Sequence, residues 1–234
     1  MRNHPNWMGD LLTANSAYAN KPINLILIPG THDSGTYGMY HDYRTQSLTI
    51  TQQLELGVRY FDCRVMKSGN SFYFHHTIQS PNKLGSVGDK PATQPYGVMN
   101  DIRNFLIAHP KEILFLKFQN ITDFWHDDYM AFMQLIKDYL VIDDAASKCE
   151  LVKLQQNTAE YIGRETICSL NTSHKRVFIF FDVTNVPTDE PTASDFWEYA
   201  FKYEPGLLTK GNYGLWDPFW GDDGSGMSPN DTDN

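Results

Sequence analysis

The apolar residues of the chain gather in short, nearly continuous runs that end at turn-forming residues. Such runs are typical of strands buried on both faces. The clearest is LILI, which stops at Pro29-Gly30 and is followed at once by Thr31, His32 and Asp33. The runs predict five strands, over residues 24–28, 58–65, 71–76, 113–119 and 175–182. The turn Ser68-Gly69-Asn70 predicts a hairpin between the second and the third.

Segments with helical spacing of apolar residues lie between and after most of these runs. One segment ends at Gly57, and another places Ile102, Phe105 and Leu106 on one stripe before Pro110. The pattern predicts helices over residues 48–57, 96–108, 124–140 and 194–203, the last capped by Ser194 or Asp195. Residues 80–95 are rich in proline and glycine and predict a long loop.

Strands that alternate with helices predict an α/β protein with a parallel sheet covered by helices. A closed eight-stranded barrel usually needs about 250 residues, and few residues follow the fifth strand, which ends at Asp182. We therefore expect a distorted or incomplete TIM-like (β/α) barrel. It would form one domain over residues 1–220, followed by a tail over 221–234 whose composition predicts disorder.

Composition and charge limit the classes of partner and of site that we expect for this chain. The chain has a net charge of −9 and scattered Lys and Arg residues, so it lacks the basic stripe of a nucleic-acid-binding protein. Its three cysteines, with no CxxC spacing, predict neither a disulfide framework nor a zinc site. Residues 1–12 lack the apolar segment of a signal peptide, and no run is long enough to span a membrane.

Polar side chains stand at or just beyond the carboxyl ends of all five predicted strands. In parallel α/β folds these ends form the rim of the active site, because the loops there converge on one opening. The residues are His32 and Asp33, Arg64, His75 and His76, Lys117, and Asp182. Because neighbouring side chains on a strand face opposite ways, only one histidine of the HH pair can point into this opening.

The same alternation places Asp62 and Arg64 on one face, where a salt bridge between them would fix the guanidinium. A planar, permanently charged guanidinium suits a phosphate group. Together with two histidines, which suit both proton-transfer roles near neutral pH, it predicts a phosphoryl-transfer site. His32, Asp33, Asp62 and His76 are also potential metal ligands, but Arg64 among them would repel a divalent ion, so we expect no metal and no cofactor.

Four blocks resemble the X domain of phosphatidylinositol-specific phospholipase C in its bacterial form. They are PGTHDSGTY, GVRYFDCRV, FYFHHT and, after a helix and a proline, ILFLKF. The resemblance covers about residues 5–120, and the order and spacing of the blocks make it more specific than any single motif. It implies His32 as general base, Asp33 as the carboxylate beside the phosphate, Arg64 as the phosphate clamp and His76 as general acid.

The resemblance also implies supporting residues. Lys117 matches a lysine that contacts inositol, Asp62 would support Arg64, and Asp182 ends a strand that carries a basic inositol contact in the bacterial enzymes. Arg64 stands where calcium-dependent relatives have carboxylates, which implies a calcium-independent enzyme. The late aspartate that orients the base in the family has no clear match; Asp182, Asp217 and Asp222 are the candidates.

The implied reaction is a lyase reaction, in which the inositol 2-hydroxyl attacks phosphorus to release diacylglycerol and inositol 1,2-cyclic phosphate. The implied partner is a phosphoinositide-type lipid at a membrane surface, with Tyr37, Met39, Tyr40 and the WDPFW stretch as candidate rim residues. The resemblance suggests a secreted protein. Two alternatives stay open: a metal-dependent glycerophosphodiesterase- or sphingomyelinase-like enzyme of the same fold, and a catalytically inactive barrel that binds lipid or glycan.

Overall fold

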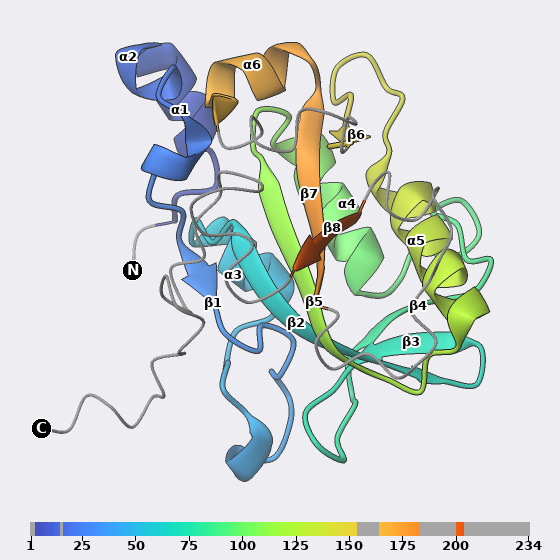
Figure 1. The fold of residues 1–234 in the computed structure, drawn as a ribbon. Coiled ribbons are helices and arrows are strands. Elements are labelled where there is room, and N and C mark those ends of the chain that lie inside the picture. The colour runs from blue at the N-terminus through green and yellow to red at the C-terminus, as the bar shows by residue number, and fades with distance from the viewer. Residues whose placement is uncertain (1–2, 15, 154–163, 183–199, 204–234) are drawn as a thin grey trace, which may run out of the picture.

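The computed structural model describes residues 3–14, 16–153, 164–182 and 200–203 (Figure 1). Its helices are α1 (Trp7–Ala14), α2 (Ser16–Ala19), α3 (Ile50–Glu55), α4 (Val98–Ala108), α5 (His126–Leu140) and α6 (Ile167–Thr172). Two short 3₁₀ turns, η1 (Ile23–Leu25) and η2 (His41–Tyr43), precede α3. The strands are β1 (Gly30–Thr31), β2 (Tyr60–Ser68), β3 (Ser71–Phe74), β4 (Lys83–Ser86), β5 (Leu114–Thr122), β6 (Glu150–Leu151), β7 (Lys175–Asp182) and β8 (Ala200–Tyr203).

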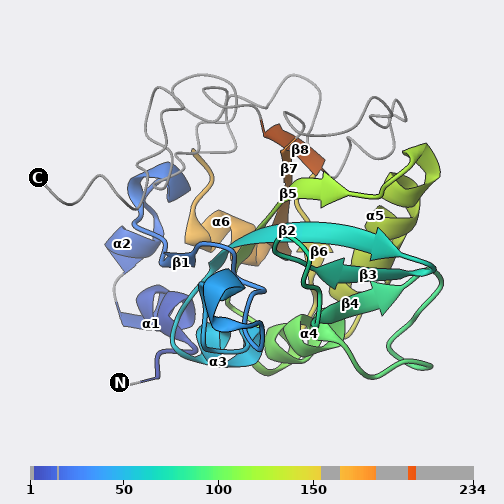
Figure 2. The same cartoon turned by 90° about the horizontal axis from the view of Figure 1, so that it is seen from below.

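The described strands form one curled sheet around a parallel centre. β2, β5 and β7 lie side by side and parallel; β1 pairs with β2, and β6 and β8 pair with β7, all in parallel. At the other edge β3 is antiparallel to β2, which confirms the hairpin predicted between the second and the third strand, and β4 is antiparallel to β3. The tight turn at Gly69-Asn70 returns the chain directly alongside β2. The result is a half-barrel with α3, α4 and α5 on its outer face (Figures 1 and 2).

Alternating residues of the central strands separate the two faces of this sheet. The outer residues belong to the large apolar core under α3, α4 and α5; they include Phe61, Cys63 and Val65 of β2, Leu114, Leu116 and Phe118 of β5, and Val177, Ile179 and Phe181 of β7. Helix α3 begins with a capping box at Thr49, and Gly57 just after it adopts φ +104°, which lets the chain turn into β2.

The inner face changes from apolar to polar along β2 and β5. Tyr60 and Phe115, with Phe178 and Phe180 of β7, belong to a second apolar cluster that also includes residues of α1 and α6. Two residues further along, β2 continues with Asp62 and β5 with Lys117, and these two lie opposite each other in the register. The inner face of the half-barrel therefore has an apolar floor with charged groups toward the carboxyl ends.

The first predicted strand was wrong in its extent. Residues 24–28 are not a buried strand: Leu25 and Leu27 are exposed, and β1 consists of Gly30 and Thr31 alone. The partner strand explains this, because β2 begins at Tyr60, which pairs with Gly30. Residues before Pro29 extend past the end of β2 and have no ladder partner on that side.

Two other expectations need correction. The predicted loop over residues 80–95 contains β4, an edge strand whose side chain Leu84 is buried in the main core. The predicted helix over residues 194–203 is wrong at its end, where residues 200–203 form β8; residues 194–199 lie outside the described part of the chain, as does the predicted tail from Gly221. The predicted helices before Pro110 and over 124–140 are present as α4 and α5.

The remaining features of the fold concern its cysteines and the lengths of its helices. All three cysteines are free thiols. Among the helices that the structure describes, none is both long and apolar enough to cross a membrane.

Candidate active site

The loop after β1 presents two adjacent side chains at the carboxyl edge of the sheet. Asp33 adopts φ +45°, a left-handed conformation that aspartate tolerates better than most residues, and its backbone turns sharply there. The next amide, that of Ser34, donates to the carbonyl of Asp62 across 2.8 Å. Gln46 donates from Nε2 to the carbonyl of His32 across 2.8 Å. Contacts from both sides therefore hold the loop against β2.

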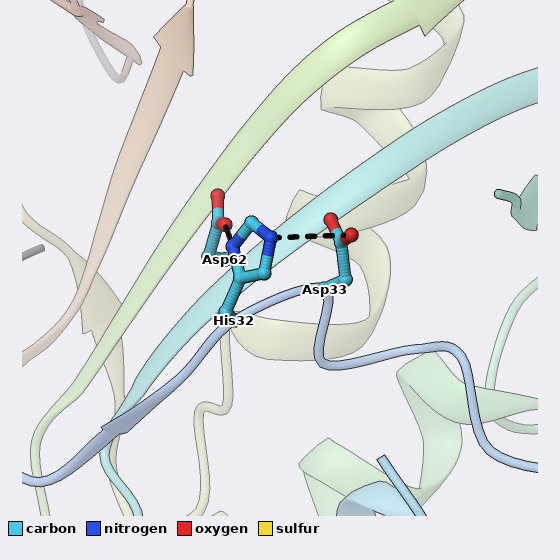
Figure 3. A group of neighbouring side chains, drawn as sticks. All are labelled: His32, Asp33 and Asp62. Atoms are coloured by element: carbon cyan, nitrogen blue, oxygen red, sulfur yellow. Dashed lines mark hydrogen bonds and ion pairs between the residues drawn. The ribbon is translucent and has the colours of Figure 1, made fainter. Parts of the chain in front are cut away.

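The imidazole of His32 lies between two carboxylates from different elements (Figure 3). Its Nδ1 is 2.8 Å from Oδ2 of Asp62, and its Nε2 is 3.3 Å from Oδ2 of Asp33. Both aspartates are buried, whereas the His32 side chain is 36% exposed. The ring is therefore accessible from the opening while its two nitrogens face buried acids.

Asp33 also contacts two further basic side chains. Arg64 donates from Nε to Oδ1 of Asp33 across 2.6 Å, and Nε2 of His76 is 3.4 Å from Oδ2. The Arg64 and His76 side chains are 23% and 21% exposed, so both border the opening. Oδ2 of Asp33 thus lies between the Nε2 atoms of the two histidines.

Asp62 has partners other than the one expected from the sequence. The prediction that it forms a salt bridge supporting Arg64 was wrong: the structure pairs Asp62 with His32 and with Lys117, whose Nζ is 3.6 Å from Oδ1, while Arg64 pairs with Asp33. The loop after β1 brings Asp33 over β2, which makes Asp33 the partner of the guanidinium. Lys117 is buried beside Asp62.

The two histidines of the HH pair face different surroundings. His75 is buried, and its Nε2 donates to the backbone carbonyl of Asn120 across 2.9 Å. His76 faces Asp33, and its ring centroid lies 6.1 Å from that of Tyr43. Only the second histidine of the pair borders the site, and His75 ties β3 to the end of β5.

The environments of the two site histidines shift their pKa values in opposite directions. The pKa of His32 is raised, chiefly by the hydrogen bond to Asp62 and also by the charge of Asp33, against a lowering effect of burial. The pKa of His76 is lowered, first by burial and then by the charge of Arg64. His32 is therefore the stronger base of the two and His76 the stronger acid.

Three of these side chains are near enough to one another to share an ion. Ligand atoms of His32, Asp33 and Asp62 all lie within 4.8 Å of one another. Their carboxylates, however, already face cations of the chain itself: Arg64 bonds Asp33, and Lys117 faces Asp62. A divalent ion would have to enter beside both positive charges, so the donor set fits a metal poorly.

Several expected residues are buried or fall outside the described part of the chain. Asp182 is the last residue of β7 and its side chain is outside the described part of the chain, as are Asp217, Asp222 and WDPFW. Met39 is buried and therefore not available as a rim residue, whereas Tyr37 is partly buried and packs against the main core. Tyr40 is exposed, and sequence reasoning missed Ile78, which is also exposed and lies in the loop that contacts Tyr40; its position two residues after the HH pair was the available signal.

Comparison with known proteins places the chain in a family. The family model described as PI-PLC X (PI-PLC X 1) matches residues 18–211, a range that includes all the site residues of β1, β2, β3 and β5. The chain belongs to this family.

The curated relatives include a human protein and a bacterial one. The chain is 27% identical over 168 residues to PI-PLC X domain-containing protein 2 of Homo sapiens, covering 58% of this chain and 45% of the relative. It is 30% identical over 122 residues to 1-phosphatidylinositol phosphodiesterase of Listeria monocytogenes, covering 48% and 34%. The chain thus spans less than half the length of these two relatives.

A solved structure agrees with the fold. The phosphatidylinositol-specific phospholipase C from Listeria monocytogenes matches with a TM-score of 0.50 and 20% identity, over 76% of this chain and 56% of that chain. This likeness, together with the curled sheet, confirms the expected incomplete TIM-like barrel.

Proposed function

We propose that the chain is a metal-independent phosphodiesterase that cleaves a phosphoinositide-type lipid into diacylglycerol and inositol 1,2-cyclic phosphate. The observation that carries the proposal is the position of Asp33. One of its carboxylate oxygens lies within 3.4 Å of the Nε2 atoms of both His32 and His76, and the other accepts from Arg64. The related Listeria protein is named for this class of substrate.

Cyclising cleavage of a phosphodiester needs three groups, and the site offers each of them. A base must take the proton of the attacking hydroxyl, a cation must stabilise the growing charge on the phosphoryl oxygens, and an acid must protonate the leaving oxygen. In the proposal His32 is the base, Arg64 the cation and His76 the acid. In the same proposal Asp33 fixes the guanidinium of Arg64, and the phosphorus and the leaving oxygen of the substrate lie beside Asp33.

The nucleophile belongs to the substrate itself. Attack by the inositol 2-hydroxyl on the neighbouring phosphorus forms a new phosphorus–oxygen bond as the bond to diacylglycerol breaks, and the proton moves from the hydroxyl to Nε2 of His32. His76 gives a proton to the glycerol oxygen. Because the attack is intramolecular, the enzyme does not need to order a second reactant, which removes a large part of the entropic barrier.

Two large exposed side chains, Tyr40 and Ile78, favour a lipid over a water-soluble molecule as the substrate. We call this pair the apolar lip. Tyr40 is 78% exposed and Ile78 is 81% exposed, and their loops touch where the amide of Tyr40 donates to Oε1 of Gln79 across 2.9 Å. Ile78 is two residues from His76. Two large exposed side chains beside the catalytic opening would contact acyl chains when the site faces a bilayer.

One observation favours a second candidate, a metal-dependent glycerophosphodiesterase- or sphingomyelinase-like enzyme. It is the proximity of His32, Asp33 and Asp62 within 4.8 Å. The positive charges of Arg64 and Lys117 beside the two carboxylates weigh against this reading, and the experiment below separates the two candidates.

The test is release of water-soluble headgroup from phosphatidylinositol vesicles in excess EDTA, with the product identified by phosphorus NMR. We expect a cyclic phosphate from the wild type and its loss in His32→Ala and His76→Ala. His41→Ala is the matched control, because the His41 side chain is 93% exposed and its ring nitrogen Nδ1 lies 3.5 Å from the similarly exposed carboxylate of Asp42.

The other outcomes overturn the proposal. Turnover that stops in EDTA and returns with calcium or magnesium would establish the metal-dependent candidate. Vesicle binding without turnover would identify a binding module, and full activity in either histidine variant would exclude the assigned roles.

A further inference from the structure

We propose that Asp62 is the positioning residue of His32, and that Lys117 is its buried counter-ion. The inference rests on the proposed function only in naming His32 as the base. From the sequence, the partner of this histidine was expected near the end of the chain. The structure places it instead on β2, two residues before Arg64.

The hydrogen bond determines which nitrogen of the ring is free. Nδ1 of His32 is 2.8 Å from Oδ2 of Asp62, the shortest contact that the ring makes with either carboxylate. An ionised carboxylate only accepts hydrogen bonds, so Nδ1 must carry a proton. In the neutral ring the lone pair is then on Nε2, the nitrogen that faces Asp33 and the opening.

Asp62 is well suited to hold a ring in place. It lies in the middle of the sheet, with Lys117 directly opposite it in the register of β2 and β5. Both side chains are buried, and Nζ of Lys117 is 3.6 Å from Oδ1 of Asp62. A buried carboxylate is costly unless it is paired, and the ammonium supplies that pairing on the oxygen that His32 does not use.

The two acids beside His32 therefore have separate tasks. Asp33 is engaged by Arg64 at 2.6 Å and lies farther from the ring, at 3.3 Å. It belongs to the phosphate side of the site, whereas Asp62 sits behind the ring. The arrangement is a carboxylate–imidazole pair in which the acid fixes the tautomer and stabilises the imidazolium that forms on proton transfer.

This reading also changes the task of Lys117. The family resemblance implied that it contacts inositol, but its side chain is 1% exposed and faces Asp62. We assign it to Asp62, so recognition of the headgroup must come from other residues.

The test uses Asp62→Asn and two independent readouts. Asparagine keeps the shape but offers its amide to the ring, which permits the wrong tautomer. We expect kcat to fall about 10²- to 10⁴-fold with little change in KM. We also expect histidine nitrogen NMR to show Nδ1–H on neutral His32 in the wild type and a loss of that tautomer in Asp62→Asn, with the His32 signals assigned through His32→Gln.

A control variant and two variants that test the role of Lys117 complete the experiment. Asp143→Asn removes an exposed carboxylate and should change neither readout. Lys117→Met leaves Asp62 buried without its counter-ion and should lower the melting temperature, and the double variant Lys117→Met/Asp62→Asn should regain part of that loss.

The outcomes separate this inference from the proposed function. Wild-type His32 with its proton on Nε2, or an Asp62→Asn variant with unchanged tautomer and kcat, would overturn the role of Asp62. A wild type that has the expected tautomer but cleaves no lipid would overturn the proposed function and leave the pairing of His32 with Asp62 in place.

Discussion

Arg64 bonds Asp33 through Nε across 2.6 Å, although the two residues are 31 positions apart and come from different strand ends. The contact fixes the guanidinium by one of its five N–H donors and holds the carboxylate so that its other oxygen faces both histidines. The ion pair therefore fixes the guanidinium of Arg64 and holds one carboxylate oxygen of Asp33 beside both histidines of the proposed reaction.

The first prediction concerns this pair. Arg64→Lys keeps a positive charge but loses the planar fork that can bond Asp33 and a phosphoryl oxygen together. We expect kcat for phosphatidylinositol cleavage to fall about 10²- to 10³-fold, the usual effect of removing one donor that stabilises a transition-state oxyanion. Steady-state kinetics on mixed micelles would measure it. A kcat of Arg64→Lys within twofold of the wild-type value would show that a positive charge at this position is sufficient for activity.

The second prediction concerns pH. The proposed reaction needs neutral His32 and protonated His76, but the pKa of His32 is raised and that of His76 is lowered. The productive form of the free enzyme is then a minority species. Its population rises with pH up to the lower pKa, that of His76, stays level between the two, and falls above the higher pKa, that of His32.

The kcat/KM profile should therefore be bell-shaped, with the acidic limb set by His76 and the alkaline limb by His32. Asp62→Asn removes the main cause that raises the pKa of His32, so the alkaline limb should move to lower pH while the acidic limb stays. A shift of the acidic limb instead would assign that limb to His32. NMR titration of the two rings provides the independent check.

The sequence was sufficient to predict which residues of the site lie at one edge of the sheet. It was not sufficient to predict which acid pairs with which base. The periodicity of the runs around Asp62, His76 and Lys117 was sufficient to place them at one edge of a sheet, because alternation is a local property. Which acid meets which base depends on the loop after β1. The left-handed turn at Asp33 carries that carboxylate over Arg64 and leaves Asp62 to His32.

The errors in the predicted fold also arise from contacts between segments that are distant in the sequence, which a local pattern does not contain. The run at residues 24–28 looks like a strand, yet a strand needs a neighbour, and β2 begins only at Tyr60. The strand β4 was missed because its sequence, KLGS, contains one large apolar residue, and its pairing with β3 comes from the hairpin geometry rather than from its own pattern.

The third prediction concerns the apolar lip. Tyr40→Ser/Ile78→Ser should weaken binding to phosphatidylinositol vesicles about tenfold or more, because burial of a large apolar side chain contributes about 1.5–3 kcal/mol and 1.4 kcal/mol is a factor of ten. Cleavage of a short-chain, monomeric substrate should remain near the wild-type rate. Vesicle sedimentation measures the first quantity. Equal losses on both substrates would mean that the lip shapes the site itself and does not contact the bilayer.

The last prediction concerns the charged network at the amino-terminal end of the sheet. Glu112 is fully buried; its carboxylate accepts from Nε of Arg59 across 2.8 Å and from the amide of Gly9 across 2.9 Å, and it forms an ion pair with Nη2 of Arg59 at 2.8 Å. Arg176, also buried, donates to the backbone carbonyl of Glu112. The network joins α1 to β2, β5 and β7, and it lies away from the residues assigned to catalysis.

Glu112→Gln would keep the shape but leave the buried Arg59 without its counter-ion, which typically costs about 3–5 kcal/mol. We expect the urea midpoint to fall accordingly with an unchanged slope, and kcat per folded molecule to stay near the wild-type value. Glu150→Gln is the matched control, since its pair with Lys148 is partly exposed and exposed pairs contribute about 0–1 kcal/mol. Equal midpoints for the two variants would show that this network does not stabilise the half-barrel.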